Sequence, residues 1–94
     1  MGERVEGKWI YFGKLDMPER KTEVWQVISK HGGFLGGVKW FGRWRTYSFY
    51  PEPETIYEDD CLMEIANFIK DLMEKQKNKR LYQNERRNKK RFYS

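Results

Sequence analysis

The fourteen residues VKWFGRWRTYSFYP, at positions 38–51, carry the side chains of this chain best suited to hold a ligand. They include two tryptophans, two tyrosines, two phenylalanines and the three cations Lys39, Arg43 and Arg45. Guanidinium groups bind phosphates in bidentate fashion, and aromatic rings stack on nucleobases. Residues 24–50 contain no acid, so a surface formed by them would be positive. The chemistry indicated is therefore binding of phosphates and bases.

A hydrophobic core is the simpler interpretation of most of these aromatic residues, because cross-strand ring pairs stabilise small sheets. Side chains alternate between the two faces of a strand, so Tyr47 and Phe49 oppose Ser48 and Tyr50. One helix covers one face, and the other face stays open unless the N-terminal segment folds over it. We predict a hairpin whose rings form part of the core and whose second face binds nucleic acid. The predicted contact residues in it are Lys39, Trp40, Arg43, Trp44, Arg45 and Tyr47.

A second basic region occupies residues 74–94, with nine Lys or Arg against two Glu, a net charge of +7. The whole chain has a net charge of +5, so residues 1–73 sum to −2. Such a segment attracts polyanions by counterion release, although a solvated, solubilising tail is an alternative interpretation. The tail residues predicted to contact nucleic acid are Lys79, Arg80, Arg86, Arg87, Lys89, Lys90 and Arg91.

Catalysis has little support in the sequence. His31 is the single histidine and lies in a glycine turn, and Cys61 lies on an apolar stripe without an evident cationic partner. The six acids of residues 51–64 suit the start of a helix better than a metal site. The sequence contains no glycine-rich phosphate loop, paired metal-ligand motif or catalytic triad pattern. We therefore predict no enzyme activity, no cofactor and no metal.

The pattern of apolar residues predicts strands followed by one helix in a single small domain. The predicted strands are residues 22–29, 34–41 and 44–50. A KHGG turn at 30–33 joins the first two, and Gly42 with Arg43 suits a two-residue hairpin connection. Gly36 and Gly37 indicate a β-bulge or a close backbone approach.

A 3.6-residue period after residue 54 predicts the helix, with Asp59 or Asp60 as its N-terminal cap. Its predicted apolar stripe consists of Cys61, Leu62, Ile65, Phe68, Ile69, Leu72 and Met73. Residues 74–91 are mostly good helix formers, so the helix can continue into solvent as a basic rod.

The predicted fold is α+β: a three-stranded antiparallel sheet, or a four-stranded one if residues 8–13 add a strand, packed against one long C-terminal helix. The domain division is an N-terminal extension with that optional strand at 1–20, a core of three strands and a helix at 21–73, and a basic tail or helix extension at 74–94. No apolar run is long enough for a membrane span, and no signal peptide is recognised. The single cysteine favours a reducing cytoplasm.

A longer pattern runs through residues 21–73: W-x-V, then G-x-[VI]-K-W-[FY]-x-x-W-R-x-[YF]-x-F-[FY]-P, then C-[LM]-x-x-I-x-x-F-[IL]. It resembles the pattern of a family of small, mostly uncharacterised bacteriophage and prophage proteins. The matching residues are Trp25, Val27, Gly36, Val38, Lys39, Trp40, Phe41, Trp44, Arg45, Tyr47, Phe49, Tyr50, Pro51, Cys61, Leu62, Ile65, Phe68 and Ile69. The resemblance implies a phage origin and a bacterial host cell, and assigns no activity. The predicted element order is also similar to that of the arm-binding domains of phage integrases, which lay a three-stranded sheet in the major groove.

Two classes of function follow. The first is a phage nucleic-acid-binding module, for DNA or RNA, that uses the hairpin and the tail. The alternative is a phage inhibitor of a host protein, an anti-defence or host-takeover factor that binds a protein or sequesters a nucleotide. The acidic residues 52–60 would then mimic nucleic acid towards a basic host protein. A structural protein of the virion or the ribosome, with its tail threaded into RNA or DNA, is a third interpretation.

Overall fold

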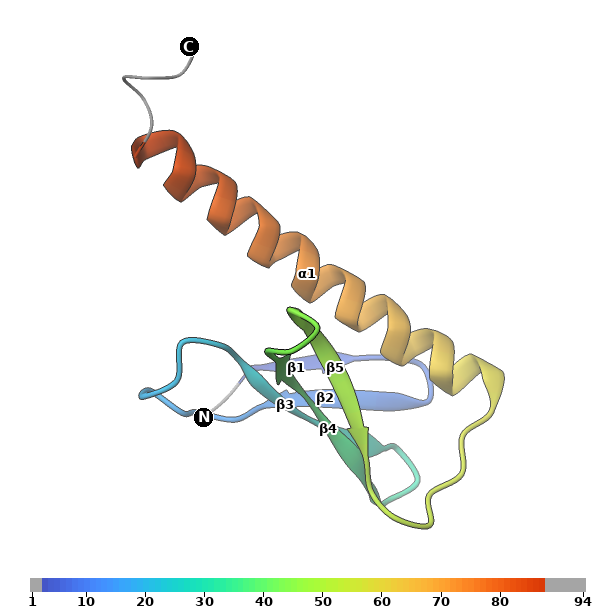
Figure 1. The fold of residues 1–94 in the computed structure, drawn as a ribbon. Coiled ribbons are helices and arrows are strands. Elements are labelled where there is room, and N and C mark those ends of the chain that lie inside the picture. The colour runs from blue at the N-terminus through green and yellow to red at the C-terminus, as the bar shows by residue number, and fades with distance from the viewer. Residues whose placement is uncertain (1–2, 88–94) are drawn as a thin grey trace.

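A computed structural model describes residues 3–87, with side chains through residue 77 (Figure 1). The elements are β1 (Arg4–Glu6), β2 (Ile10–Lys14), β3 (Val24–Ser29), β4 (Phe34–Phe41), β5 (Thr46–Pro51) and α1 (Asp59–Arg87). The strands lie side by side in chain order as an antiparallel five-stranded sheet. The helix crosses one face of this sheet and runs on beyond it (Figure 1).

The predicted sheet of three or four strands was wrong, because residues 1–20 contribute both β1 and β2. In β2, Ile10 and Phe12 are buried and alternate with residues of the other face. The Gly7 N–H donates to the Ile10 carbonyl oxygen at 2.8 Å and closes the turn between β1 and β2. With five strands, the predicted likeness in element order to three-stranded integrase domains no longer holds.

The helix packs through Phe68 onto the middle of the sheet. The Phe68 ring is stacked on Phe12, with centroids 3.9 Å apart, and meets Trp25 edge-on at 4.9 Å. The buried core consists of Ile10, Phe12, Trp25, Val27, Val38, Tyr47, Cys61, Ile65, Phe68 and Leu72. Strands β2 to β5 each contribute inward residues to this core, and one helix covers it.

The predicted helical stripe is correct except at its start. Leu62 is 49% exposed, whereas Cys61 beside it is buried. The N-terminal cap is Glu58, not Asp59 or Asp60: the Cys61 N–H donates to a Glu58 carboxylate oxygen at 3.0 Å.

Of the two predicted turns between strands, the structure has one as predicted and one longer. The glycine turn at 30–33 is confirmed, with φ of 91° at Gly32. The predicted two-residue connection between β4 and β5 was wrong: four residues, 42–45, link the strands. Arg45 has φ of 55° and donates its N–H to the Phe41 carbonyl oxygen at 2.9 Å. Trp44 and Arg45 therefore belong to the tip of the hairpin, not to a strand.

The predicted irregularity in β4 is also present. Val27 pairs with Gly36 and Ile28 pairs with Phe34, which leaves one extra residue in β4. Gly36 has φ of 153°, and a Cβ there would overlap the Tyr50 carbonyl oxygen. Both a bulge and a close backbone approach occur at this position.

Candidate functional site

The sheet face opposite α1 is covered by no other element of residues 3–87 (Figure 1). Strand pairing and alternation assign the following residues to it: Arg4, Glu6, Tyr11, Gly13, Val24, Gln26, Ile28, Phe34, Gly37, Lys39, Phe41, Thr46, Ser48 and Tyr50. None of them is buried. We call this set the open face.

Two cations of the open face lie on aromatic rings. The Arg4 guanidinium carbon is 3.8 Å from the centre of the Tyr11 ring. The Lys39 ammonium nitrogen is 4.5 Å from the centre of the Tyr50 ring. Such cation–π contacts hold long side chains close to the sheet. A phosphate bound by either cation would therefore lie next to an aromatic surface.

The rings on the β4–β5 side continue to the hairpin tip. Phe41 meets Tyr50 edge-on at 6.4 Å and meets Trp44 edge-on at 4.9 Å. Trp44 is 69% exposed. The aromatic surface therefore extends from the open face onto the outermost turn of the sheet.

Between the two cation–ring pairs, one row across the open face carries little side-chain volume. Gln26 on β3 pairs with Gly13 of β2 on one side and with Gly37 of β4 on the other. Glycines add no side chain, so the amide of Gln26 is the functional group at the centre of this row. That amide can both donate and accept hydrogen bonds. This row therefore carries one polar group between the two cation–ring pairs.

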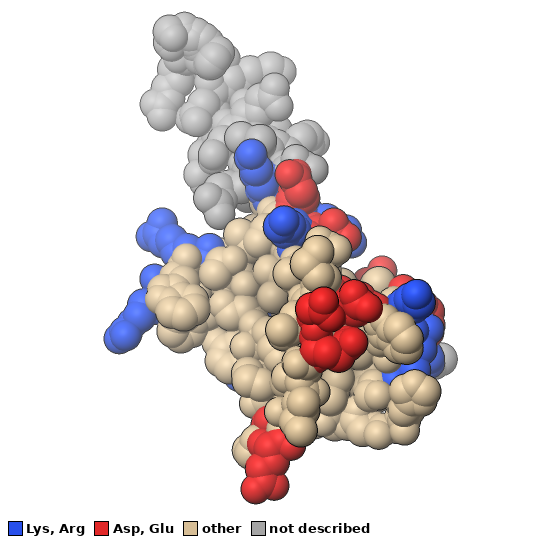
Figure 2. All heavy atoms as spheres, turned by 90° about the vertical axis from the view of Figure 1, so that its right-hand side faces the viewer, with Lys and Arg blue, Asp and Glu red and all other residues tan. Residues whose placement is uncertain are grey.

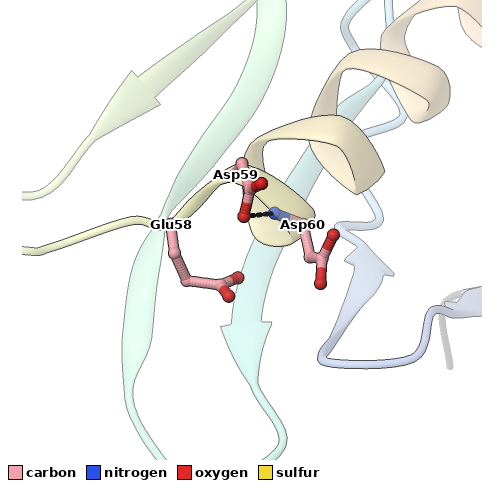
Figure 3. A group of neighbouring side chains, drawn as sticks. All are labelled: Glu58, Asp59 and Asp60. Atoms are coloured by element: carbon pink, nitrogen blue, oxygen red, sulfur yellow. Dashed lines mark hydrogen bonds between the residues drawn. The ribbon is translucent and has the colours of Figure 1, made fainter.

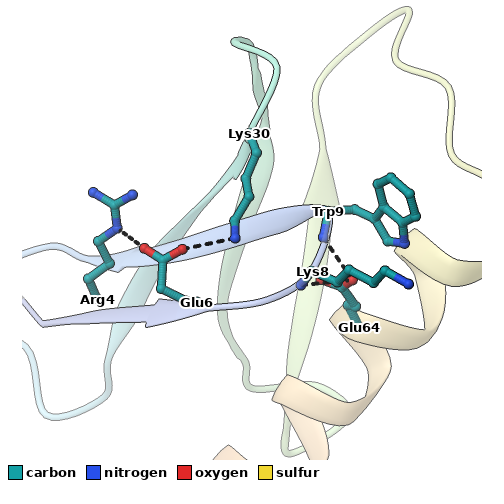
Figure 4. Close-up of polar contacts among 6 residues, drawn as sticks. All are labelled: Arg4, Glu6, Lys8, Trp9, Lys30 and Glu64. Atoms are coloured by element: carbon teal, nitrogen blue, oxygen red, sulfur yellow. Dashed lines mark hydrogen bonds and ion pairs between the residues drawn. The ribbon is translucent and has the colours of Figure 1, made fainter.

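Glu6 is the one acid among the open-face residues defined above. Its carboxylate forms ion pairs with Arg4 and, at 3.1 Å, with Lys30 (Figure 4). The hydrogen bond from Lys30, and after it the one from Arg4, lowers the pKa of Glu6. Glu6 thus stays charged and offsets part of the positive charge of Arg4 and Lys30 at the β1 edge.

The predicted hairpin residues are divided between two sides of the sheet. Lys39 lies on the open face, and Arg43 and Trp44 lie exposed at the hairpin tip. Tyr47 is 4% exposed and lies under the helix, where its hydroxyl accepts the Glu23 N–H at 3.1 Å and burial raises its pKa.

Trp40 packs edge-on against Tyr47, with centroids 5.3 Å apart, and is part of the core side. Arg45 lies beside α1. Of the predicted tail residues, Lys79, Arg80, Arg86 and Arg87 belong to α1, beyond its described side chains. Lys89, Lys90 and Arg91 lie outside the described residues.

Arg4, Tyr11, Gln26 and Tyr50 were missed as candidate residues. The signal for Gln26 is its position between Trp25 and Val27, two apolar residues that both face the core. Tyr11 lies in the same way between two buried residues of β2. A polar residue inside an apolar alternation marks the uncovered face of a strand.

The acids near the start of α1 form a separate group. Carboxylate oxygens of Glu58, Asp59 and Asp60 lie within 4.8 Å of one another, and all three residues are exposed (Figure 3). Glu58 caps the helix, and Asp59 accepts the N–H of Asp60 at 2.9 Å. These bonds and the helix dipole account for the group without a metal. In the view of Figure 2, acidic side chains occupy the middle and lower edge of this side of the molecule, with basic ones to either side.

The start of α1 is tied to the sheet by Glu64. One of its carboxylate oxygens accepts the backbone N–H groups of Lys8 and Trp9, at 3.2 and 3.0 Å (Figure 4). Cys61 is buried next to this contact, and burial raises the pKa of its thiol. A thiol of that kind is a poor nucleophile. The contacts of Glu64 hold the start of α1 on the turn between β1 and β2.

Fold and open face together define a small five-stranded antiparallel sheet protein with one helix and one uncovered aromatic face. The chain is 35% identical over 71 residues to an uncharacterised 9.3 kDa protein of Acholeplasma phage L2, a match that covers 74% of this chain and 91% of that protein. The chain belongs to this family of small phage proteins. No protein-family model and no solved structure matches it. Within residues 3–87 no helix is long and apolar enough to span a bilayer.

Proposed function

We propose that this protein binds nucleic acid through the open face and the tip of the β4–β5 hairpin. The observation that carries the proposal is the pair of cation–ring contacts, Arg4 on Tyr11 and Lys39 on Tyr50, on a sheet face that no described element covers. Lys and Arg supply the affinity for phosphates, and rings supply stacking surfaces for bases.

Each part of the face has a role in this binding. In the bound state Arg4 and Lys39 turn from the rings that they cover to phosphates, and the uncovered rings of Tyr11 and Tyr50 stack on the neighbouring bases. Gln26, in the row between them, hydrogen-bonds to the edges of bases. Rings bind bases of any kind, so we expect weak sequence preference.

The test is fluorescence anisotropy of labelled oligonucleotides titrated with protein at several salt concentrations. Each neutralised phosphate contributes a log–log slope of about −0.7 for single strands and about −0.9 for duplex DNA. We expect Lys39→Gln to reduce the slope by one such increment. Lys8→Gln is the matched control, because it removes the same charge at the β1–β2 turn, outside the open face. The proposal is wrong if no oligonucleotide binds at low salt or if the two variants behave alike.

A second candidate is inhibition of a host protein, favoured by one observation. Ile56 is 93% exposed in the loop before α1, between the exposed acids Glu54 and Glu58. An apolar side chain among acids suits a basic partner with a small apolar pocket. Pull-down from host lysate with nuclease tests this: one protein retained by the wild type and lost with Ile56→Ser would favour this candidate.

A further inference from the structure

A second basic surface lies on the other side of the hairpin tip, between β5 and the middle of α1. This groove is lined by Arg45, Thr46, Ile69, Lys70, Met73, Glu74 and Lys77. Three cations against one acid give it a net charge of +2. Ile69 and Met73 pack partly against the core, and Met73 accepts the Tyr47 N–H at its sulfur, 3.4 Å away. The floor is therefore fixed and apolar, and the charged groups lie around it.

Two consecutive residues of the hairpin tip connect the groove to the open face. Trp44 lies edge-on against Phe41 of the open face. Arg45, with φ of 55°, lines the groove on the helix side. The turn thus places an aromatic residue on one side of the sheet and a cation on the other. Around this edge the rings of Tyr50, Phe41 and Trp44 come first, and the cations that line the groove follow them.

From this geometry, and resting on the proposed function, we infer that the ligand is single-stranded nucleic acid that passes from the open face over the hairpin tip into the groove. A duplex hides the faces of its bases in the stack, so Tyr11 and Tyr50 cannot stack on them. DNA duplex has a persistence length of about 150 base pairs and cannot fold around one turn of a sheet at low cost. A single strand is flexible enough to reach both surfaces.

If the strand takes this path, the groove contributes to the binding affinity of long strands alone. A single strand of about 4 nucleotides fits on the open face, whereas one of about 12 nucleotides also reaches the groove. At 0.1 M salt, one lost phosphate contact lowers the affinity for a single strand roughly fivefold, and two lower it roughly 25-fold. Lys70→Gln with Lys77→Gln should therefore weaken binding of the longer strand roughly 25-fold and leave that of the shorter strand unchanged.

The control is Lys8→Gln with Lys75→Gln, which removes the same charge. Lys75 lies on the same helix as Lys77 and is exposed, but does not line the groove. Anisotropy is measured with oligothymidylates of both lengths and with a duplex of the longer length, and circular dichroism checks that each variant is folded.

The outcomes separate the inference from the proposed function. Tighter binding of the single strand, with a loss specific to the groove variant and the longer strand, supports the inference. Equal affinity for the duplex, or equal effects of the groove and control variants, overturns the inference and leaves the proposed function standing. Absence of binding by every oligonucleotide overturns both.

Discussion

Replacement of Phe68 by alanine tests how the helix is held on the sheet. Phe68 is 7% exposed, is stacked on Phe12 with an interplanar angle of 7°, and meets Trp25 edge-on. Its two ring contacts join β2, which belongs to residues 1–20, to β3 at the centre of the sheet. Leu62 lies on the same helix and was predicted on the same stripe, but it is 49% exposed. Substitutions at Phe68 and at Leu62 therefore distinguish the packing of the helix on the sheet from the stability of the helix itself.

The expected magnitude follows from burial. Removal of a buried Phe side chain costs about 3–5 kcal/mol, because transfer and cavity terms add. A domain of this length has an unfolding free energy of roughly 5–14 kcal/mol at about 0.05–0.15 kcal/mol per residue. Phe68→Ala thus removes a large part of the unfolding free energy of the domain. Phe68→Leu keeps much of the volume but loses two ring pairs at about 0.5–1.5 kcal/mol each, so we expect roughly 1–3 kcal/mol.

The assay is urea denaturation followed by tryptophan fluorescence and by circular dichroism, with the slope of the transition compared between variants. Leu62→Ala should cost less than about 1 kcal/mol, since an exposed side chain leaves no cavity. The reasoning is refuted if Leu62→Ala costs as much as Phe68→Ala, or if Phe68→Ala costs under about 1 kcal/mol. Either result would mean that another face of the helix lies on the sheet.

Four further predictions concern single positions. Gly36→Ala should destabilise by about 3 kcal/mol or more in urea denaturation, since its Cβ overlaps the Tyr50 carbonyl oxygen, whereas Gly13→Ala meets no atom within 4 Å and should cost little. Glu58→Ala should lower the unfolding free energy by about 1 kcal/mol and Glu58→Gln by less, because glutamine keeps an oxygen that can cap the helix. Burial raises the pKa of Tyr47, so its contribution to stability is present below its ordinary value of 10.0 and is lost as pH rises through the folded value; Tyr47→Phe should flatten the alkaline fall in unfolding free energy. Lys39→Gln should increase self-association in sedimentation velocity at low salt, because it uncovers the Tyr50 ring and removes a repulsive charge.

Much of the fold could be predicted where side-chain patterns are strong. The bounds of Phe34–Phe41 agree with the prediction, and those of Val24–Ser29 differ at the N-terminal end alone, because dense β-branched and aromatic residues lie on either side of a glycine turn. Arg4–Glu6 could not be recognised, because all three side chains are exposed and the strand is held by backbone pairing to β2. The hairpin loop was predicted too short since Arg45 adopts a left-handed conformation that arginine rarely takes.

The aromatic and basic residue types of the candidate surface could be read from the sequence, but not the face on which they lie. Alternation correctly separated Tyr47 and Phe49 from Ser48 and Tyr50. It could not say which set receives the helix, because both sets contain aromatic rings. The choice depends on β2 and β3, whose inward residues fix the face on which Phe68 packs. The pairing of β2 and β3 with the hairpin, which links residues far apart in the sequence, therefore determines which rings face the helix and which are exposed.

An uncovered aromatic sheet face is ordinarily a surface for association between copies of a chain, since apolar patches seek burial. Here the rings of Tyr11 and Tyr50 lie beneath cations, and glycines occupy two places of the central row. A second copy laid on this face would bring the cations Arg4 and Lys39 of both copies onto one interface, where like charges repel each other. The groups that hinder such pairing are the ones that attract a polyanion. We therefore expect the open face to stay free of a second copy, which is consistent with the proposed binding of phosphates and bases.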